Sequence, residues 1–315
     1  MATKIILPLR ENDDENDEMT KDIDKDIDKK KDKEKDNDKQ NGKDNHLEKE
    51  KQKRGYFNRF MTSDVIGRRK MFMTACTEPL VEPDFLNIFI ENGFDFQNFK
   101  IQDKNSYKHG YNAIQLIIDG YVLGSNCNEK IRILAEHGIN LNNICIKRGF
   151  TALHLAVMKQ LPASVIKLLL DLGSIPDILS NQKLTALHIA SKIKNNVFTV
   201  RTLLQYKSDV NIRTYFGYTP LHYGVISDDI SIVKELLENG ADLSIHRSKI
   251  SMDDSAITLS KNLGRWNILN LLLEKEKYNK MVKSVEKNKK KSYKKQQKAK
   301  YFFEDYSKLS LSANG

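Results

Sequence analysis

A short motif recurs in this chain at a fixed interval of 34 residues. It reads TALHLA at 151–156, TALHIA at 185–190 and TPLHYG at 219–224. Each copy is followed by a second apolar segment that ends in a leucine pair: Leu169-Leu170, Leu203-Leu204 and Leu236-Leu237. A unit of this size cannot bury its own apolar face, so a fixed period predicts that successive units stack around one continuous core.

Weaker copies of both signals flank the three clear ones. In these copies a weaker form of the motif is again followed by a second apolar segment. The pairs are 71–75 and 89–93, 112–117 and 134–138, and 255–259 and 271–273. We therefore predict six units between residues 64 and 278, strongest at 149–246. The first two intervals are about 42 and 39 residues, longer than the usual ~33, which predicts inserted loops near 97–109 and 119–127.

The motif resembles the ankyrin repeat, whose signature is T-P-L-H-x-A followed by L-L-x-x-G-A-D-V-N, and the resemblance covers residues 138–246. It implies an all-α repeat solenoid of stacked helix-turn-helix units with β-hairpin-like finger loops. It also implies a non-enzymatic protein–protein interaction module. In this family the partner usually meets the concave surface formed by the fingers and the first helix of each unit.

Individual positions of the motif are expected to have mechanical roles. Thr151, Thr185 and Thr219 should be helix N-caps, worth about 1 kcal/mol each, and Pro220 should occupy the first helical position. Glycines should end the second helices in the left-handed conformation, at Gly93, Gly138, Gly173 and Gly240. Lys207 stands where the fourth unit would have this glycine, so we predict a strained corner over 203–211.

Charge is unevenly spread along the chain, whose formal net charge is +10. Residues 11–50 hold 17 acids and 10 lysines, whereas residues 275–300 hold 12 lysines and two glutamates. The N-terminal segment cannot bury enough apolar surface to order, so we predict a disordered charged tail at 1–54. We predict a lysine-rich tail at 279–315, partly helical or disordered. Because no glycine ends the last helix, that helix could continue into the tail.

Several functional classes find no support in the sequence. No stretch approaches the roughly 20 apolar residues of a membrane-spanning helix, and three cysteines make neither a disulfide framework nor a zinc motif. We find no nucleotide-binding, metalloprotease or hydrolase motif. The histidines of the repeated motif, His154, His188 and His222, are interpreted as structural rather than metal-binding. We therefore expect no enzyme activity, no cofactor and no metal, and an intracellular monomer in the cytoplasm rather than the nucleus.

The candidate site is a set of basic and aromatic residues on the predicted fingers at 146–150, 179–184, 213–218 and 246–250. Its partner-binding candidates are Lys147, Arg148, Phe150, Lys183, Arg213, Tyr215, Phe216, Tyr218, Arg247 and Lys249. Lysines also follow the first helices, at Lys159, Lys192, Lys194 and Lys261. One interpretation is a surface for an acidic, partly aromatic protein segment, because Arg and Tyr are favoured interface anchors. The others are that loops of a lysine-rich chain simply carry such residues, or that the surface binds nucleic acid.

The tails leave further alternatives open. The C-terminal lysines could be only solvated, or form a nuclear-import signal, or contact nucleic acid or an anionic membrane. The alternative function is therefore a nucleic-acid- or chromatin-associated factor. A host-directed ankyrin effector is another, because the resembled family includes such proteins. Residues 11–28, with net charge −8, could cover the basic fingers through their tether. The aromatic segment Tyr301–Tyr306 could dock on the last unit or act as a linear motif.

Overall fold

The structure is a computed structural model that describes residues 48, 50–79, 81–247 and 255–312, without the side chains of 293 and 295–312. It divides into two compact units, residues 1–71 and residues 72–315. In the first unit, residues 50–62 are helical. Phe60 is buried there, and the Arg68 guanidinium lies 4.9 Å from the centre of its ring. The helix includes residues 50–54, the last of the N-terminal tail; for residues 1–47, which are outside the described residues, disorder stays a prediction.

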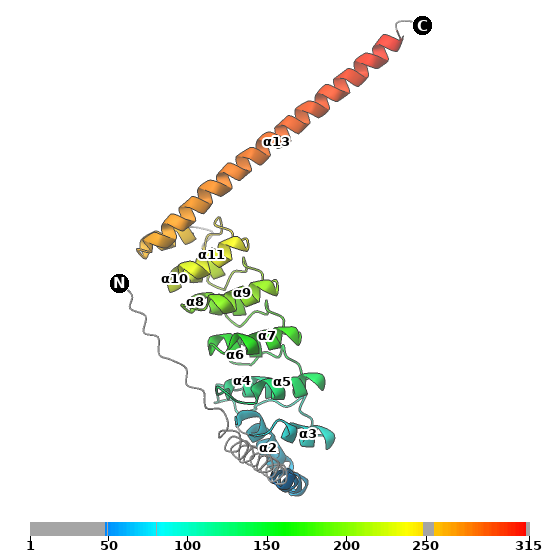
Figure 1. Ribbon diagram of the computed structural model, residues 1–315, viewed down its shortest axis with the longest axis vertical. Coiled ribbons are helices and arrows are strands. Elements are labelled where there is room, and N and C mark those ends of the chain that lie inside the picture. Colours follow the sequence, from blue (N-terminus) through cyan, green and yellow to red (C-terminus); the bar gives the residue numbers. More distant parts are fainter. Residues whose placement is uncertain (1–47, 49, 80, 248–254, 313–315) are drawn as a thin grey trace, which may run out of the picture. The chain divides into compact units, whose positions relative to one another are not determined.

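Helices of the second unit follow one another in pairs, an inner helix and then an outer helix (Figure 1). The inner helices are α4 (Ala113–Asp119), α6 (Ala152–Met158), α8 (Ala186–Lys192), α10 (Pro220–Ser227) and α12 (Ala256–Asn262). The outer helices are α3 (Asp84–Glu91), α5 (Cys127–Glu136), α7 (Ala163–Asp171), α9 (Val197–Gln205), α11 (Ile230–Glu238) and α13 (Trp266–Ser312), and α2 (Val65–Thr77) precedes them. Each inner helix packs on the next from α4 to α12, and α7, α9 and α11 pack in series. This order confirms the predicted all-α repeat solenoid.

Each inner helix of the three clear repeats begins at a threonine that shares a capping box with the histidine three residues later. The backbone N–H groups of Thr151 and Thr185 donate to Nδ1 of His154 and His188 at 3.2 and 3.1 Å, and Thr219 forms the same box. Because Nδ1 accepts, the ring proton is on Nε2, which donates to a carbonyl of the next repeat. That acceptor is the Leu184 oxygen for His154, at 3.0 Å. The predicted caps and the structural role of the histidines are confirmed.

Gln115 replaces the histidine in the repeat before these three. It closes the capping box of α4 with Asn112, accepting from the Asn112 N–H at 2.9 Å. Its amide nitrogen donates to the carbonyls of Asn143 and Phe150, at 3.0 and 2.7 Å. Gln115 is fully buried. An uncharged amide can therefore make both bonds that the histidines make in the later repeats.

The finger loops are tight turns that are bonded to one another along the stack. Each fingertip is linked to the preceding one by a backbone bond: Ile146 N–H to the His109 oxygen, Asn181 N–H to the Arg148 oxygen, and Tyr215 N–H to the Gln182 oxygen, at 3.0–3.1 Å. The described residues contain no regular strand, although His246 and Ser255 form an isolated antiparallel bridge. The acceptor stands three residues before the capping residue of its inner helix in every link, so the fingers are held in a fixed register.

Left-handed residues close the outer helices, as predicted. Gly93, Gly138, Gly173 and Gly240 have φ of 70°, 80°, 98° and 88°, and Lys207 takes the same conformation with φ 61°. Lys183, at the tip of its finger, has φ 56° where the neighbouring fingers have Gly149 and Gly217. A side chain in this conformation meets the following carbonyl oxygen, at a cost of about 1 kcal/mol. The backbone of the fourth repeat is therefore strained at two places, the fingertip at Lys183 and the end of α9 at Lys207.

The cysteines are free and buried, and two of them flank a buried lysine. Lys130 is 2% exposed, and its Nζ donates to the Glu78 carbonyl just after α2, at 2.7 Å. Burial raises the pKa of Cys76 and of Cys127 to about 12, although the Lys130 charge acts in the opposite direction. These thiols are therefore packing residues at neutral pH.

Replacing Lys207 by glycine should stabilise the repeat unit, because glycine adopts the left-handed conformation without steric strain. We expect the free energy of unfolding of Lys207→Gly to rise by about 1 kcal/mol in urea titrations. The matched change Gln205→Gly, at the exposed end of α9, should lower it instead. A loss of stability in both variants would contradict the assignment of strain to Lys207.

The capping histidines should make the stack sensitive to mild acid. Burial lowers the pKa of His154 and of His188 to about 4, against 6.5 for the free side chain. Their contribution is therefore complete above about pH 6.5 and is lost as the pH falls towards 4, on the order of 3 kcal/mol for each. His188→Gln, which copies Gln115, should fold at pH 7 and lose less stability over this range. Urea unfolding across that pH range measures this; equal losses in both proteins would refute it.

Candidate protein-binding surface

The predicted fingers form one row along the stack, which we call the finger surface. It consists of residues 146–150, 179–184, 213–218 and 246–247, together with the exposed side of inner helices α6, α8, α10 and α12. Backbone links position the first three fingers, and the Arg213 side chain bonds the third finger to the last. Lys249 was predicted to belong here but lies outside the described residues.

Three predicted basic residues stand at the outer tips of this surface. Lys147 and Arg148 are exposed on the first finger. The Lys147 Nζ donates to the Asn105 carbonyl at 2.9 Å, and the Arg148 guanidinium lies 6.0 Å from the centre of the Phe150 ring. Lys183 is exposed at the tip of the second finger and has no ion pair within the described residues. Arg148 and Lys183 thus present positive charge to solvent.

Tyr215 and Phe216 form an exposed aromatic pair on the third finger. Their exposed fractions are 72% and 64%, and their rings meet edge to face with centroids 5.4 Å apart. The Tyr215 N–H is bonded to the Gln182 oxygen, next to Lys183. An aromatic pair on a bonded backbone gives a partner large contact area with little loss of conformational freedom.

Arg213, Tyr218 and Arg247 are joined to one another and hold the last finger. One nitrogen of the Arg213 guanidinium donates to the carbonyls of His246 and Arg247, at 2.9 and 2.8 Å. The Arg247 guanidinium donates to the Tyr218 hydroxyl at 2.6 Å and lies 5.2 Å from the centre of its ring. A Cβ on Gly217 would lie 2.0 Å from the Arg247 carbonyl, so the two fingers touch. These three residues stabilise the scaffold in addition to facing the surface.

An apolar row on the inner helices lies beside the fingers, and counting charges in the sequence did not find it. Ile189, Tyr223 and Leu259 occupy the position after the histidine, or its equivalent, in α8, α10 and α12, and all three are partly exposed. The Tyr223 ring contacts His188 edge to face, with centroids 5.9 Å apart. The repeat alignment itself could have shown the row, because these positions are adjacent to the buried histidines. The finger surface therefore combines basic tips with an apolar floor.

An ion cluster covers the inner-helix side at the second and third repeats. The Asp119 carboxylate accepts from Lys108 at 2.8 Å and from Lys159 at 2.7 Å, and from the Tyr107 hydroxyl at 3.0 Å. Burial opposes the charge on Asp119, but the bonds from the two lysines outweigh it and lower the pKa of this carboxyl. Lys159 was predicted to add to the basic surface, and the structure pairs it with an acid 40 residues earlier. Lys159 is therefore not available to a partner as a free charge, and the available part of the finger surface begins after this ion cluster.

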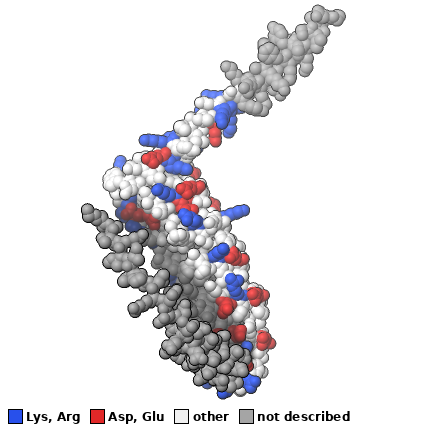
Figure 2. All heavy atoms as spheres, viewed as in Figure 1, with Lys and Arg blue, Asp and Glu red and all other residues white. Residues whose placement is uncertain are grey.

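The outer helices carry a different charge pattern. Blue and red atoms alternate along them in Figure 2, and pairs join neighbouring repeats, as in the Arg201–Glu235 bridge at 2.8 Å. The Tyr206 hydroxyl donates to Asp171 in the same way. No helix in the described part of the chain is long and apolar enough to span a membrane. Within the same residues, no cluster of histidine, cysteine and acidic side chains could hold a metal ion.

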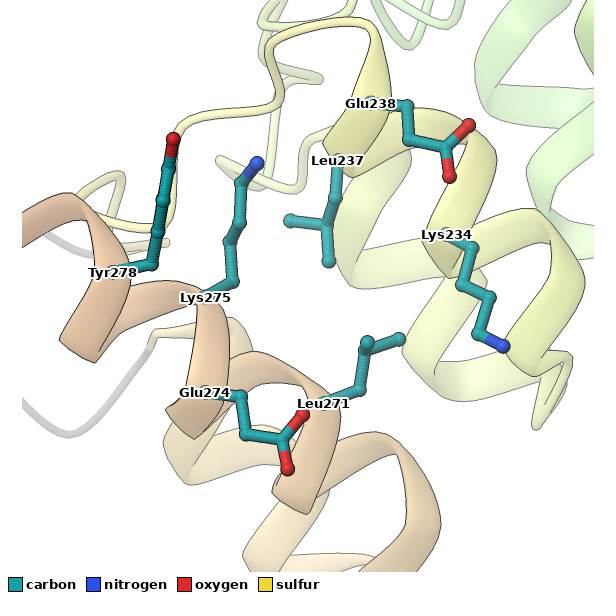
Figure 3. Close-up of a pocket in the computed structure, with 7 residues that line it drawn as sticks. All are labelled: Lys234, Leu237, Glu238, Leu271, Glu274, Lys275 and Tyr278. Carbon is teal, nitrogen blue, oxygen red and sulfur yellow. The ribbon is translucent and has the colours of Figure 1, made fainter.

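A cavity of about 370 Å³ lies between α11 and α13 (Figure 3). Its apolar lining comes from Leu237 and Leu271, with Tyr278 at one side, and two lysines and two glutamates surround them. Leu237 is buried whereas Tyr278 is 57% exposed. The last outer helix thus covers its neighbour only in part, and the mixed charges of this cavity favour no particular ligand.

Arg213 and Lys183 should differ in their effect on stability, although both were predicted from sequence as partner contacts. Arg213→Gln removes two bonds to the last finger and should lower the free energy of unfolding by about 1–3 kcal/mol. Lys183→Gln removes an exposed charge and should change it by less than about 0.5 kcal/mol. Urea titration of the two variants provides the comparison. Similar values would show that Arg213 does not support the finger.

Comparisons with known proteins match the central repeats. The family model "Ankyrin repeats (3 copies)" matches residues 159–247. The ankyrin repeat protein FPV031 of fowlpox virus is 31% identical over 118 residues, 36% of this chain and 34% of the relative. The human B-cell lymphoma 3 protein is 38% identical over 97 residues, 30% of this chain and 21% of the relative. The palmitoyltransferase AKR1 of Lachancea kluyveri is 31% identical over 112 residues, 35% of this chain and 15% of the relative.

The family match lies within the repeats. The aligned part spans about a third or less of each relative's length, so the activity in the palmitoyltransferase's name belongs to that protein. The residues that the family model matches include α7 to α11, the caps at Thr185 and Thr219, and the fingers at 179–184 and 213–218. Within residues 159–247 the chain therefore consists of ankyrin repeats.

Proposed function

We propose that the chain binds a protein partner through the finger surface, and that the partner contributes an acidic segment with apolar side chains. Ankyrin repeats are generally protein-interaction modules, which agrees with such a role. The observation that carries the proposal is the exposed pair Tyr215–Phe216 beside Lys183 on a fixed fingertip. Aromatic side chains of this kind are the usual anchors of protein interfaces.

The expected charge of the partner follows from the lysines that have no acidic partner within the described residues. Lys183, Lys192 and Lys194 are exposed on one repeat and have no ion pair within the described residues. A partner with acidic side chains would meet them and associate faster at low salt. The affinity itself would come from apolar contacts with the fingertip pair and with the row at Ile189 and Tyr223.

Nucleic acid on the finger surface is a weaker candidate. Its affinity would rest on several phosphate contacts, but Lys159 is paired with Asp119, and Arg213 is bonded to carbonyls of the next finger. The apolar floor also offers nothing to a phosphate backbone. The host-directed alternative stays open, since relatives of similar identity come from a virus, a yeast and human.

A peptide selection tests the proposal directly. The full chain would be used to select from a library of random displayed peptides. We expect the recovered sequences to combine Asp or Glu with aromatic or aliphatic residues. The double variant Lys183→Ser, Phe216→Ser should bind these peptides at least about 10-fold more weakly, because it removes one charge and one anchor.

The outer face supplies a matched control. Lys167 is exposed on α7 and Phe198 is 70% exposed on α9, so Lys167→Ser, Phe198→Ser makes the same chemical change away from the fingers. This control variant should bind as the parent chain does. Peptides without acidic residues, or equal losses in both double variants, would refute the finger surface as the site.

A further inference from the structure

The last outer helix continues far beyond the repeat to which it belongs. In α13, Ile268 and Leu272 are buried against the last repeat, and α13 contacts both α12 and α11. After Tyr278, described side chains such as Met281 and Val285 are 60% and 46% exposed. The helix nevertheless runs to Ser312. The lysine-rich tail, which could have been helical or disordered by sequence, is thus held in helical register from its start.

That register places most of the lysines on one face. Each member is three or four residues from another member, and all fall within an arc of about 140° at about 100° per residue. These residues, which we call the lysine stripe, are Lys277, Lys280, Lys283, Lys287, Lys290, Lys291 and Lys294. All seven are exposed. They span about 26 Å along the helix at ~1.5 Å per residue.

Very little negative charge accompanies the stripe. Between residues 277 and 294 the sequence contains one acid, Glu286, which the helical register places outside the arc. Lys280 is bonded to Glu276 at 2.9 Å, one turn earlier. For the other lysines of the stripe, no ion pair is found within the described residues. The face therefore has a concentrated, uncompensated positive charge on a rigid element.

The opposite face distinguishes between kinds of polyanion. A helix that lies in a membrane surface needs a continuous apolar face, whereas here Met281 and Val285 give way to Asn288, Lys289 and Ser292. Single-stranded nucleic acid is usually held by aromatic stacking, but Tyr278 lies outside the arc. A straight basic helix fits the groove of a duplex, about 12 Å wide in B-form DNA.

We propose that the lysine stripe of α13 is a binding site for the sugar-phosphate backbone of double-stranded nucleic acid. Its ammonium groups bind phosphates and release counterions. The stripe carries no side chain suited to bidentate contacts with base edges, so recognition depends little on base sequence. This activity is separate from the finger surface and does not require it.

Salt dependence of duplex binding is the primary test, with the full chain and a short mixed-sequence DNA duplex as probe. If about five phosphates are neutralised, the logarithm of the affinity should fall with the logarithm of salt with a slope of about −4.5. The affinity would then drop roughly 500-fold between 50 and 200 mM salt. Replacing Lys283, Lys287, Lys290 and Lys294 by glutamine should make the slope shallower by about 3 to 4.

A rearranged variant separates the stripe from net charge alone. It exchanges Lys287 with Val285, Lys290 with Ser292 and Lys294 with Gln296, so composition and charge are unchanged while three lysines leave the face. We expect this variant to bind the duplex at least about 10-fold more weakly at low salt, with helix content by circular dichroism unchanged. The finger variant Lys183→Ser, Phe216→Ser should bind the duplex as the parent does.

Several results would overturn the proposal. They are failure of the parent chain to bind the duplex, equal binding by the rearranged variant, and tighter binding to single-stranded DNA. Tighter binding to phosphatidylserine vesicles than to the duplex would instead assign the stripe to membranes. None of these outcomes bears on the peptides selected by the finger surface.

Discussion

The bond from a buried histidine to the next repeat connects every level of this structure. In the clear repeats, Nδ1 of the histidine accepts the N–H of the capping threonine. Nε2 of His154 and of His188 donates to a finger carbonyl of the following repeat, that of Leu184 or Tyr218. One side chain therefore starts an inner helix and fixes the loop beside it. The bond that Nδ1 accepts requires a neutral ring, and protonation of Nδ1 would break it, whereas burial favours the neutral form. The fingers of these repeats are therefore held by the repeat that precedes them.

The ordered fingers have a direct consequence for recognition. A partner that meets Tyr215 and Phe216 does not have to order their backbone, because the Tyr215 N–H is already bonded to the preceding finger. The Arg213 guanidinium and Arg247 fix the last described finger in a similar way. Binding energy from the aromatic pair would thus be less reduced by ordering than on a free loop. Lys183 belongs to the same row of fingers and has a left-handed backbone. A glycine at this position would relieve its backbone strain.

The repeat pattern was sufficient to predict the fold, the caps and the left-handed residues that end the outer helices, including Lys207. Each of these is a local consequence of residue type within a known period. The candidate site was less predictable, because its chemistry depends on partners distant in sequence. Lys159 meets Asp119 across a repeat, and Arg213 bonds to carbonyls about one repeat later. Counting basic residues on the fingers could not show that Lys159 and Arg213 already have partners within the chain. It also could not show that Ile189, Tyr223 and Leu259 form an apolar floor.

We expect partner contact to be confined to one side of the stack. Hydrogen exchange of the full chain, with and without a selected acidic peptide, measures this contact amide by amide. Protection should increase at 180–184 and 213–218, with smaller increases in α8 and α10, and should stay unchanged in outer helices α5, α7 and α9. Protection on those outer helices, or on α13, with unchanged fingers would contradict the central claim that the finger surface is the protein-binding site.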